Sequence, residues 1–318
     1  MTSGQFAGGM FLRFVDTFSA DCRPDVLSMS GGEALLRPEL VRQLGERARR
    51  SGTRSSVLSG MFFATAGRIP PEIRAAIDAV DHFSASIDAF HERQVPRTAV
   101  FRALETLLAD GKQVSVRIVG KDASDPYIAD IVDDVRRVFD DRVPMLVRAV
   151  SGFGRALTWL RRDTATASGQ ADADPCARAA WPVVGFDGTI VACGNDDVLD
   201  GVPPHLRLGH ASVDDWATVR AHSTTSSMLR SIRLFGPEYV AQQFSDVPAR
   251  CDGYCRTCTR LSHDPKVAER VHAIMAKRSI QALEAEATAL QQKAGALLFA
   301  RRHGLPDYAE LALLGTSA

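Results

Sequence analysis

Residues 25–33 read DVLSMSGGE, a short apolar segment, Asp25–Met29, followed at once by Ser-Gly-Gly-Glu. The apolar segment has the length and composition of a β-strand, and the glycines end it. Two adjacent glycines permit backbone conformations that let a ligand approach the main chain closely, and Glu33 can accept hydrogen bonds from an ammonium group. The stretch therefore predicts a strand that leads into a ligand-binding loop, although Gly-Gly-Glu alone is equally compatible with a simple turn.

Four further segments have the same character: Ser55–Ser59, His82–Ile87, Gln113–Val119 and Val143–Ala149. Helical stretches separate them at intervals of roughly 30 residues, which is typical of βα units around a parallel sheet. Pro38 and Pro71 are placed to open two of these helices, and Gly111 to end the helix Arg97–Ala109. The sequence thus predicts an α/β fold.

The first predicted element is a helix, about residues 6–19, rather than a strand. An α/β barrel begins with a strand, and its ligands bind at the carboxyl ends of the strands. We therefore expect a partial barrel that lacks its first strand and the loop that follows it.

Five of the six cysteines lie late in the chain: Cys176, Cys193, Cys251, Cys255 and Cys258. The first two flank a predicted hairpin, Trp181–Cys193, that turns at Asp187-Gly188, and the last three are spaced Cys-x₃-Cys-x₂-Cys. Such spacing favours a metal site, with an iron–sulfur cluster, zinc and unligated cysteines as the alternatives. Cys22 stands alone and is interpreted as a small inert residue.

Composition limits the class of partner. Lys plus Arg and Asp plus Glu number 38 each, so no net charge draws the protein to nucleic acid or to an anionic membrane. No apolar run approaches the roughly 18 residues of a spanning helix, and no signal peptide follows Met1. We expect a cytoplasmic protein with reduced thiols whose partners are small molecules or a protein.

The domain organisation follows from these patterns. We expect a partial barrel over residues 1–160, a linker rich in Thr, Ala, Ser and Asp over 161–175, a cysteine domain over 176–262 and a helical segment over 263–318. From about Pro265 to Arg302 the periodicity is helical, with an apolar stripe of Val267, Val271, Ile274 and Met275. This helix either packs on the domain or docks a partner.

Several motifs in order resemble radical S-adenosylmethionine (radical SAM) enzymes. Residues 30–40, SGGEALLRPEL, resemble the family's "GGEPLLRPDL" segment, and residues 84–92, SASIDAFHE, are similar to its "SIDG…H" strand end. Residues 111–116, GKQVSV, follow a helix as in the family. Cys176, Gly188 and Cys193 resemble the Cys-x₉₋₁₅-Gly-x₄-Cys signature of the SPASM or shorter twitch extension. The resemblance covers about residues 7–260.

The resemblance implies a partial (β/α)₆ barrel that binds S-adenosylmethionine, followed by a domain with an auxiliary [4Fe–4S] cluster. It implies that Gly31, Gly32 and Glu33 bind the methionine amino group and that Ser86 and Asp88 contact the ribose. Arg117 either pairs with the methionine carboxylate or makes a structural ion pair.

The cluster ligands implied by the resemblance are Cys176 and Cys193 with two of Cys251, Cys255 and Cys258. No catalytic residue is assigned.

The chain also departs from the family. Radical SAM enzymes carry Cys-x₃-Cys-x₂-Cys after the first strand, and nothing before Gly31 supplies it. The motif of the same spacing at Cys251–Cys258 follows the hairpin and matches the position of the extension instead. The missing motif and strand both belong immediately upstream of Met1, so we expect a misplaced start, with a true loss as the alternative.

Three functions follow. The first is an N-terminally shortened radical SAM-type enzyme, whose 5′-deoxyadenosyl radical abstracts hydrogen from a peptide or a small molecule. The second is a non-catalytic relative that binds a peptide or a partner enzyme. The third is a zinc-stabilised α/β protein with a vestigial barrel site.

Overall fold

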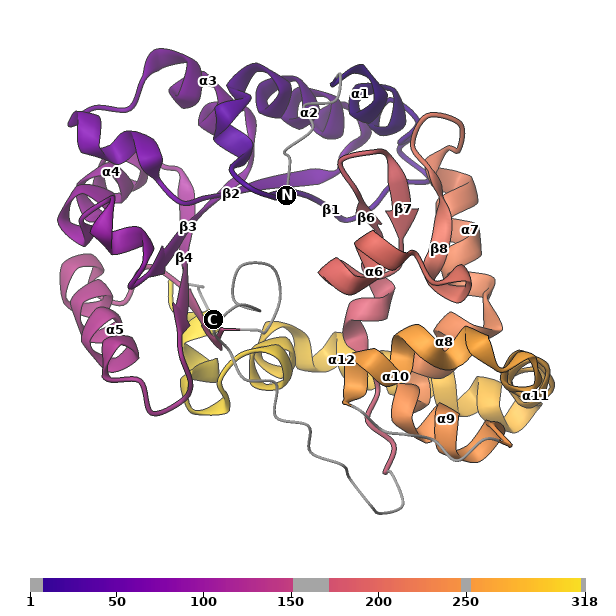
Figure 1. The fold of residues 1–318 in the computed structure, drawn as a ribbon. Helices are drawn as coiled ribbons and strands as arrows, with labels where there is room; N and C mark the ends of the chain where they lie inside the picture. The colour runs from indigo at the N-terminus through magenta and orange to yellow at the C-terminus, as the bar shows by residue number, and fades with distance from the viewer. Residues whose placement is uncertain (1–7, 151–171, 247–252, 316–318) are drawn as a thin grey trace. The chain divides into compact units, whose positions relative to one another are not determined.

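The computed structural model describes residues 8–150, 172–246 and 253–315, which form two compact units (Figure 1). The sheet unit spans residues 18–150 and the residues from 294 on. The cysteine unit spans the residues up to 17 and residues 151–293. The described residues before 18 thus group with the cysteines, and those after 293 group with the sheet. Most of the predicted linker, residues 161–175, lies outside the described residues.

The sheet unit is built on five parallel strands in the order of the chain: β1 (Val26–Met29), β2 (Arg54–Ser59), β3 (His82–Asp88), β4 (Gln113–Gly120) and β5 (Met145–Ala149). All five strands predicted from the sequence are present, with ends close to those expected. The sheet forms a parallel half-barrel, as the predicted partial α/β barrel requires.

Four helices cover one face of this sheet (Figure 1): α2 (Pro38–Ser51), α3 (Pro71–Ala79), α4 (Arg97–Ala109) and α5 (Pro126–Phe139). Pro38 and Pro71 begin helices as predicted, because a first-turn residue has no intrahelical N–H bond to lose. Phe83, Ala85 and Ile87 of β3 are at most 2% exposed and belong to the apolar core. Since side chains alternate along a strand, Ser84 and Ser86 point to the opposite face.

A short 3₁₀ helix follows each of the first three strands: η1 (Ala34–Leu36), η2 (Phe62–Ala66) and η3 (His91–Arg93). In a parallel sheet the carboxyl ends of neighbouring strands lie at the same edge. The segments that carry the predicted ligand residues are therefore gathered at one edge of the sheet.

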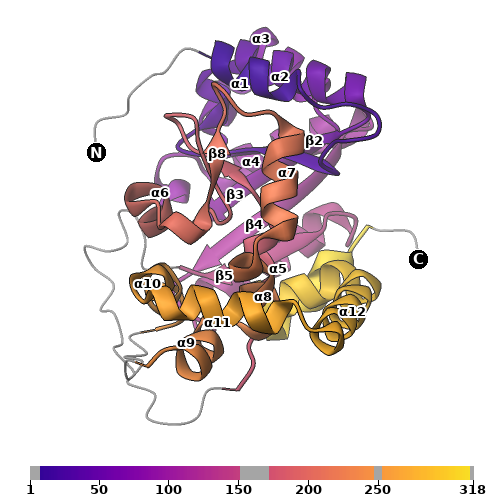
Figure 2. The ribbon, with the colours of Figure 1, turned by 90° about the vertical axis from the view of Figure 1, so that its right-hand side faces the viewer.

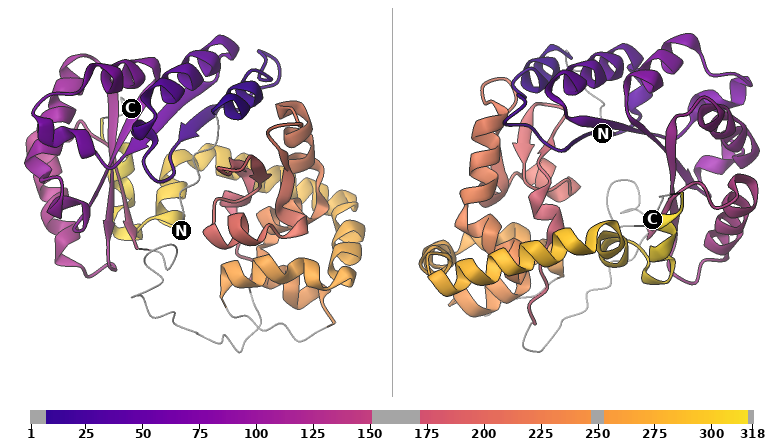
Figure 3. Two further views of the ribbon diagram at one scale, coloured as in Figure 1. Left: turned by 45° about the horizontal axis from the view of Figure 1, so that its top comes forward. Right: turned by 180° about the vertical axis from the view of Figure 1, so that it is seen from behind.

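The end of the chain covers the last strand of the sheet. The 3₁₀ helix η8 (Pro306–Leu313) packs against β5, and the Leu305 N–H donates to the Val147 carbonyl at 2.9 Å (Figure 3). Gly304 permits this approach, because a Cβ there would lie 2.8 Å from the same carbonyl oxygen. The residues after 293 thus form part of the sheet unit rather than a separate segment.

The cysteine unit contains a three-stranded antiparallel sheet in the order β6 (Val183–Val184), β7 (Thr189–Val191) and β8 (Arg207–His210). The predicted hairpin is present, and Gly188 in its turn has a positive φ of 94°. The shorter segments of this part of the unit are α1 (Gly9–Val15), η5 (Ala177–Ala180), α6 (Asp196–Gly201), η6 (Pro204–Leu206) and α7 (Trp216–Thr225).

Short helices form the rest of this unit (Figure 2): α8 (Ser227–Phe235), α9 (Pro237–Phe244), α10 (Tyr254–Arg260), η7 (Leu261–His263) and α11 (Pro265–Met275). Val267, Val271 and Met275 are buried, so α11 packs on the unit through its predicted stripe. The prediction of a single helix from Pro265 to Arg302 is wrong. The helix that begins at Pro265 ends at Met275, and Gly295 breaks the helical geometry within the next helix, α12 (Arg278–His303).

None of the described helices combines the length and apolar character that crossing a membrane requires.

Candidate functional site

The loop after β1 is shaped by two glycines. Gly31 and Gly32 have positive φ values of 88° and 46°, a region in which other residues are strained. No atom lies within 4 Å of the position that a Cβ would occupy at either residue. Glycine is therefore required here by the backbone conformation, and the loop leaves open space beside its peptide groups.

Glu33 ends this loop and ties it to the next strand. Its Oε1 accepts from the Leu35 N–H at 2.9 Å, which caps η1. Its Oε2 accepts from the Ser59 hydroxyl at 3.0 Å and from the Gly60 N–H at 2.8 Å, where β2 ends. Because each carboxylate oxygen has two lone pairs, these contacts leave Oε1 able to accept one more hydrogen bond.

Asp88, at the end of β3, is engaged by its own turn. Its Oδ1 accepts from the N–H groups of Phe90 and His91, and its Oδ2 lies 2.5 Å from His91 Nδ1. Burial raises the pKa of Asp88, but the hydrogen bonds from His91 and Phe90 outweigh it and hold the pKa below its usual value. The hydrogen bond to Asp88 raises the pKa of His91 despite partial burial.

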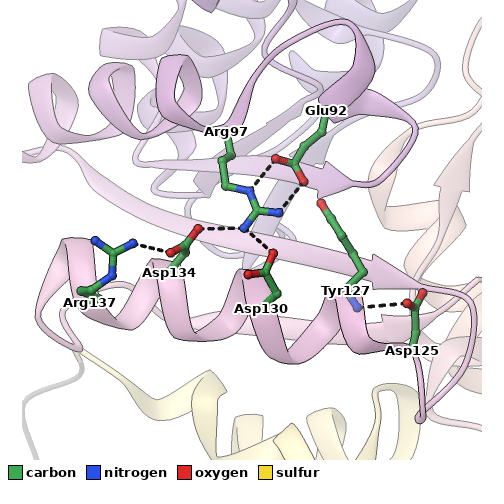
Figure 4. A network of polar contacts seen from close by, with 7 residues as sticks. All are labelled: Glu92, Arg97, Asp125, Tyr127, Asp130, Asp134 and Arg137. Carbon is green, nitrogen blue, oxygen red and sulfur yellow. Dashed lines mark hydrogen bonds and ion pairs between the residues drawn. The ribbon is translucent and has the colours of Figure 1, made fainter.

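A network of ion pairs fixes the helix η3 that carries His91 (Figure 4). Arg97 binds both carboxylate oxygens of Glu92, at 2.6 and 3.0 Å, and also lies 2.7 Å from Asp130 and from Asp134. The side chains of Arg97 and Glu92 are 19% and 18% exposed. A bidentate ion pair between partly buried groups is stronger than a surface ion pair. Because Glu92 is the neighbour of His91 in η3, this pair also fixes the position of His91.

Arg117 and Ser86 are neighbours in the register of β3 and β4. Burial alone lowers the pKa of Arg117, and no described residue hydrogen-bonds or pairs with its guanidinium. The Ser86 hydroxyl likewise has no hydrogen-bond partner among the described residues. A half-buried cation for which the described residues supply no partner is costly, and such cations are found at sites that bind an anion.

A row of polar side chains that was not predicted from the sequence lies on strands β1 to β4. The Ser115 hydroxyl lies 2.8 Å from both His82 Nε2 and the Ser84 hydroxyl, and the Ser56 hydroxyl lies 3.0 Å from that of Ser28. The alternation of these residues with apolar ones along the strands was the available signal. It predicts a polar face opposite the helices.

The structure brings four of the five late cysteines into one region. Cys176 precedes η5, and Cys193 follows β7. Cys255 and Cys258 are three residues apart in α10, a spacing that places both thiols on one side of the helix. All of these thiols are free, and Cys251 lies outside the described residues. Cys22 belongs to the other unit.

The thiols are close enough to affect one another's ionisation. Burial, together with the charges of Cys176 and Cys255, raises the pKa of Cys193 to about 11. Burial raises the pKa of Cys258 well above its usual value, with contributions from the other three thiols. Hydrogen bonds with Asn195 lower the pKa values of Cys193 and Cys255 and so oppose the effect of burial on these two thiols. The protein environment therefore favours neutral thiols unless a metal stabilises the thiolates.

The fit of these residues to a metal is partial. Four neighbouring thiols are the donors that an iron–sulfur cluster uses, and N–H donors such as Asn195 tune such clusters. Within residues 8–150, 172–246 and 253–315, however, no three or more His, Cys, Asp or Glu side chains form a group that could hold a metal ion. Ligation by these cysteines stays a prediction.

His205 of the cysteine unit was likewise not predicted from the sequence. It lies against the backbone of Cys258, and burial lowers its pKa to about 4, so the ring is neutral at neutral pH. Its place within Pro-Pro-His, away from the cysteine motif, gave no signal of this proximity.

Comparison with known proteins adds no relative. No protein-family model matches the chain, and no curated protein is similar to it at the significance required.

Proposed function

We propose that the chain is a radical SAM-type enzyme of the SPASM or twitch kind. In this proposal the sheet unit binds S-adenosylmethionine and the cysteine unit binds an auxiliary [4Fe–4S] cluster. The observation that carries it is the guanidinium of Arg117, which is half-buried and has no partner among the described residues. An uncompensated buried charge is costly, and a bound anion such as the methionine carboxylate would neutralise the guanidinium and offset that cost.

The other end of the amino acid has a matching group. Glu33 keeps one acceptor position on Oε1 for an ammonium group, and the open turn at Gly31 and Gly32 gives that group access. A carboxylate in the loop after β1 and a guanidinium within β4 suit a zwitterion. Ser86, in register with Arg117, supplies for the sugar of the same ligand a hydroxyl that has no hydrogen-bond partner among the described residues.

One electron from a reduced catalytic cluster would cleave S-adenosylmethionine to methionine and a 5′-deoxyadenosyl radical, and this radical would abstract hydrogen from a substrate carbon. The residues before Gly31 supply no Cys-x₃-Cys-x₂-Cys motif for such a cluster. The protein's own part is to hold the ligand and to orient it. Glu33 and Arg117 fix the amino-acid end, and the Arg97 network keeps the neighbouring η3 in place. The substrate class proposed is a peptide or a small molecule.

The test is anaerobic reconstitution of the full chain with iron and sulfide, followed by metal analysis and by binding and cleavage assays with S-adenosylmethionine. We expect about four irons per chain with sulfide. We also expect binding that is lost in Arg117→Met and kept in Arg54→Met, which removes an exposed arginine of β2. Binding without cleavage under dithionite agrees both with the shortened enzyme and with the alternative, a non-catalytic relative, because no Cys-x₃-Cys-x₂-Cys motif precedes Gly31. Cleavage would mean that the late cysteines are misassigned. Zinc without iron, or equal binding by the two variants, contradicts the proposal.

A further inference from the structure

The imidazole of His91 lies between two carboxylates from different strand ends. Its Nδ1 is 2.5 Å from Asp88 Oδ2, at the end of β3. Its Nε2 faces the space above Gly60, at the end of β2. A Cβ at Gly60 would lie 3.3 Å from His91 Nε2 and 3.6 Å from Glu33 Oε2. The histidine therefore reaches the same small region as the carboxylate that we expect to bind an ammonium group.

The charges around His91 favour its protonated form. The hydrogen bond and the charge of Asp88, together with the charge of Glu33, raise the pKa of His91 in spite of its burial. The two other charged residues of η3, Glu92 and Arg93, are engaged with other side chains. Glu92 is paired with Arg97, and the Arg93 guanidinium lies over the Phe90 ring, 5.5 Å from its centroid. Without a ligand, His91 thus supplies the positive charge that faces Glu33.

We propose that the His91 imidazolium is the internal counter-ion of Glu33, and that the ammonium group of a ligand replaces it, so that binding releases a proton from His91. This inference rests on the proposed function only in the choice of a ligand that carries an ammonium group. The charge balances: one ammonium group enters, one N–H bond of the imidazolium breaks, and the proton leaves to solvent. His91 remains neutral and stays hydrogen-bonded to Asp88.

The experiment is isothermal titration of the full chain with S-adenosylhomocysteine, which carries the ammonium group but undergoes no reductive cleavage. Titrations in two buffers of different ionisation enthalpy give the number of protons released on binding. Between about pH 5.5 and 7 the ammonium group stays protonated, and the raised pKa of His91 favours the imidazolium in the protein without ligand. We expect proton release by the wild type, and a Kd that rises by up to about tenfold for each pH unit below the pKa of His91.

Two substitutions separate the proposed role from a general effect. His91→Gln should abolish proton release and make the Kd independent of pH over this range. His272→Gln removes an exposed histidine of α11 and should behave as the wild type. Asp88→Asn removes the negative charge that favours the imidazolium, so it should reduce the release. An analogue without the amino group should bind without releasing a proton.

The outcomes distinguish this inference from the proposed function. If the wild type does not bind S-adenosylhomocysteine under any condition, the proposed function fails. If the wild type binds without proton release, or if wild type and His91→Gln release equal amounts, ligand binding stands and the role of His91 is refuted. Thermal melting of each variant shows whether it is folded, and His91→Gln is compared at each pH at which it stays folded at the temperature of the titration.

Discussion

Arg117→Met should stabilise the protein while it weakens ligand binding. The substitution keeps much of the length of the side chain and removes a cation that no described residue neutralises. Effective desolvation penalties are several kcal/mol for a fully buried ion, and the partial exposure of Arg117 reduces this. We expect a gain of about 1–2 kcal/mol in the free energy of unfolding, or a rise in Tm of about 2–8 °C for a unit of this size.

The assay is urea unfolding of wild type, Arg117→Met and Arg54→Met, followed by circular dichroism, with calorimetry to resolve the two units. Arg54 lies exposed at the start of β2, so its replacement should change stability by less than about 0.5 kcal/mol. The binding assay with S-adenosylhomocysteine is run on the same samples. Opposite changes in stability and affinity are expected where a charge is kept for a ligand.

A destabilised Arg117→Met would refute this reasoning. A loss of more than about 1 kcal/mol would mean that the guanidinium is neutralised within the protein, as in a structural ion pair. Arg117 would then no longer support an anion site. Unchanged stability together with unchanged affinity would remove the same support.

Three further predictions follow. His91→Gln should destabilise the protein most below about pH 6.5, because a raised pKa contributes stability at low pH that is lost as pH rises through the folded pKa; urea unfolding at acid and alkaline pH measures this. Cys258→Ser should lose most of the iron and sulfide taken up on reconstitution, whereas Cys22→Ser should keep them, as colorimetric analysis would show. Gly45→Ala in α2 should cost about 1–3 kcal/mol by chemical unfolding although alanine favours helices, because its Cβ would lie 2.7 Å from the Ala79 carbonyl oxygen.

The strands were predictable because each one carries a short apolar run with a clear end. Val114, Val116 and Ile118 of β4 are at most 4% exposed, and a strand buried on this face gives a strong pattern in the sequence. The break at Gly295 was not predictable in the same way. A single glycine is tolerated inside many helices, and only the structure shows its non-helical backbone there.

The units were harder to predict because their boundaries depend on contacts between distant residues. The Arg13 side chain of α1 donates to the carbonyls of Ala211 and Val213, both at 2.8 Å. Nothing local to the first helix indicates that partner. The same holds for Leu305 and Val147 at the other end of the chain. Local patterns predict elements, whereas such contacts decide which unit an element joins.

The candidate site shows the same division between what a pattern predicts and what only packing decides. A parallel sheet brings its strand ends to one edge, so the sequence places Glu33 and Asp88 in one region. Arg117 lies within β4, in register with Ser86. The sequence cannot say which of these groups is already satisfied by the protein. Asp88 accepts three hydrogen bonds from its own turn, whereas Arg117 has no partner among the described residues. Because Asp88 is held by these hydrogen bonds, it presents to a ligand the histidine that it orients, His91. The expected contact of Asp88 with the ribose therefore stays a prediction, and His91 is the residue to test first.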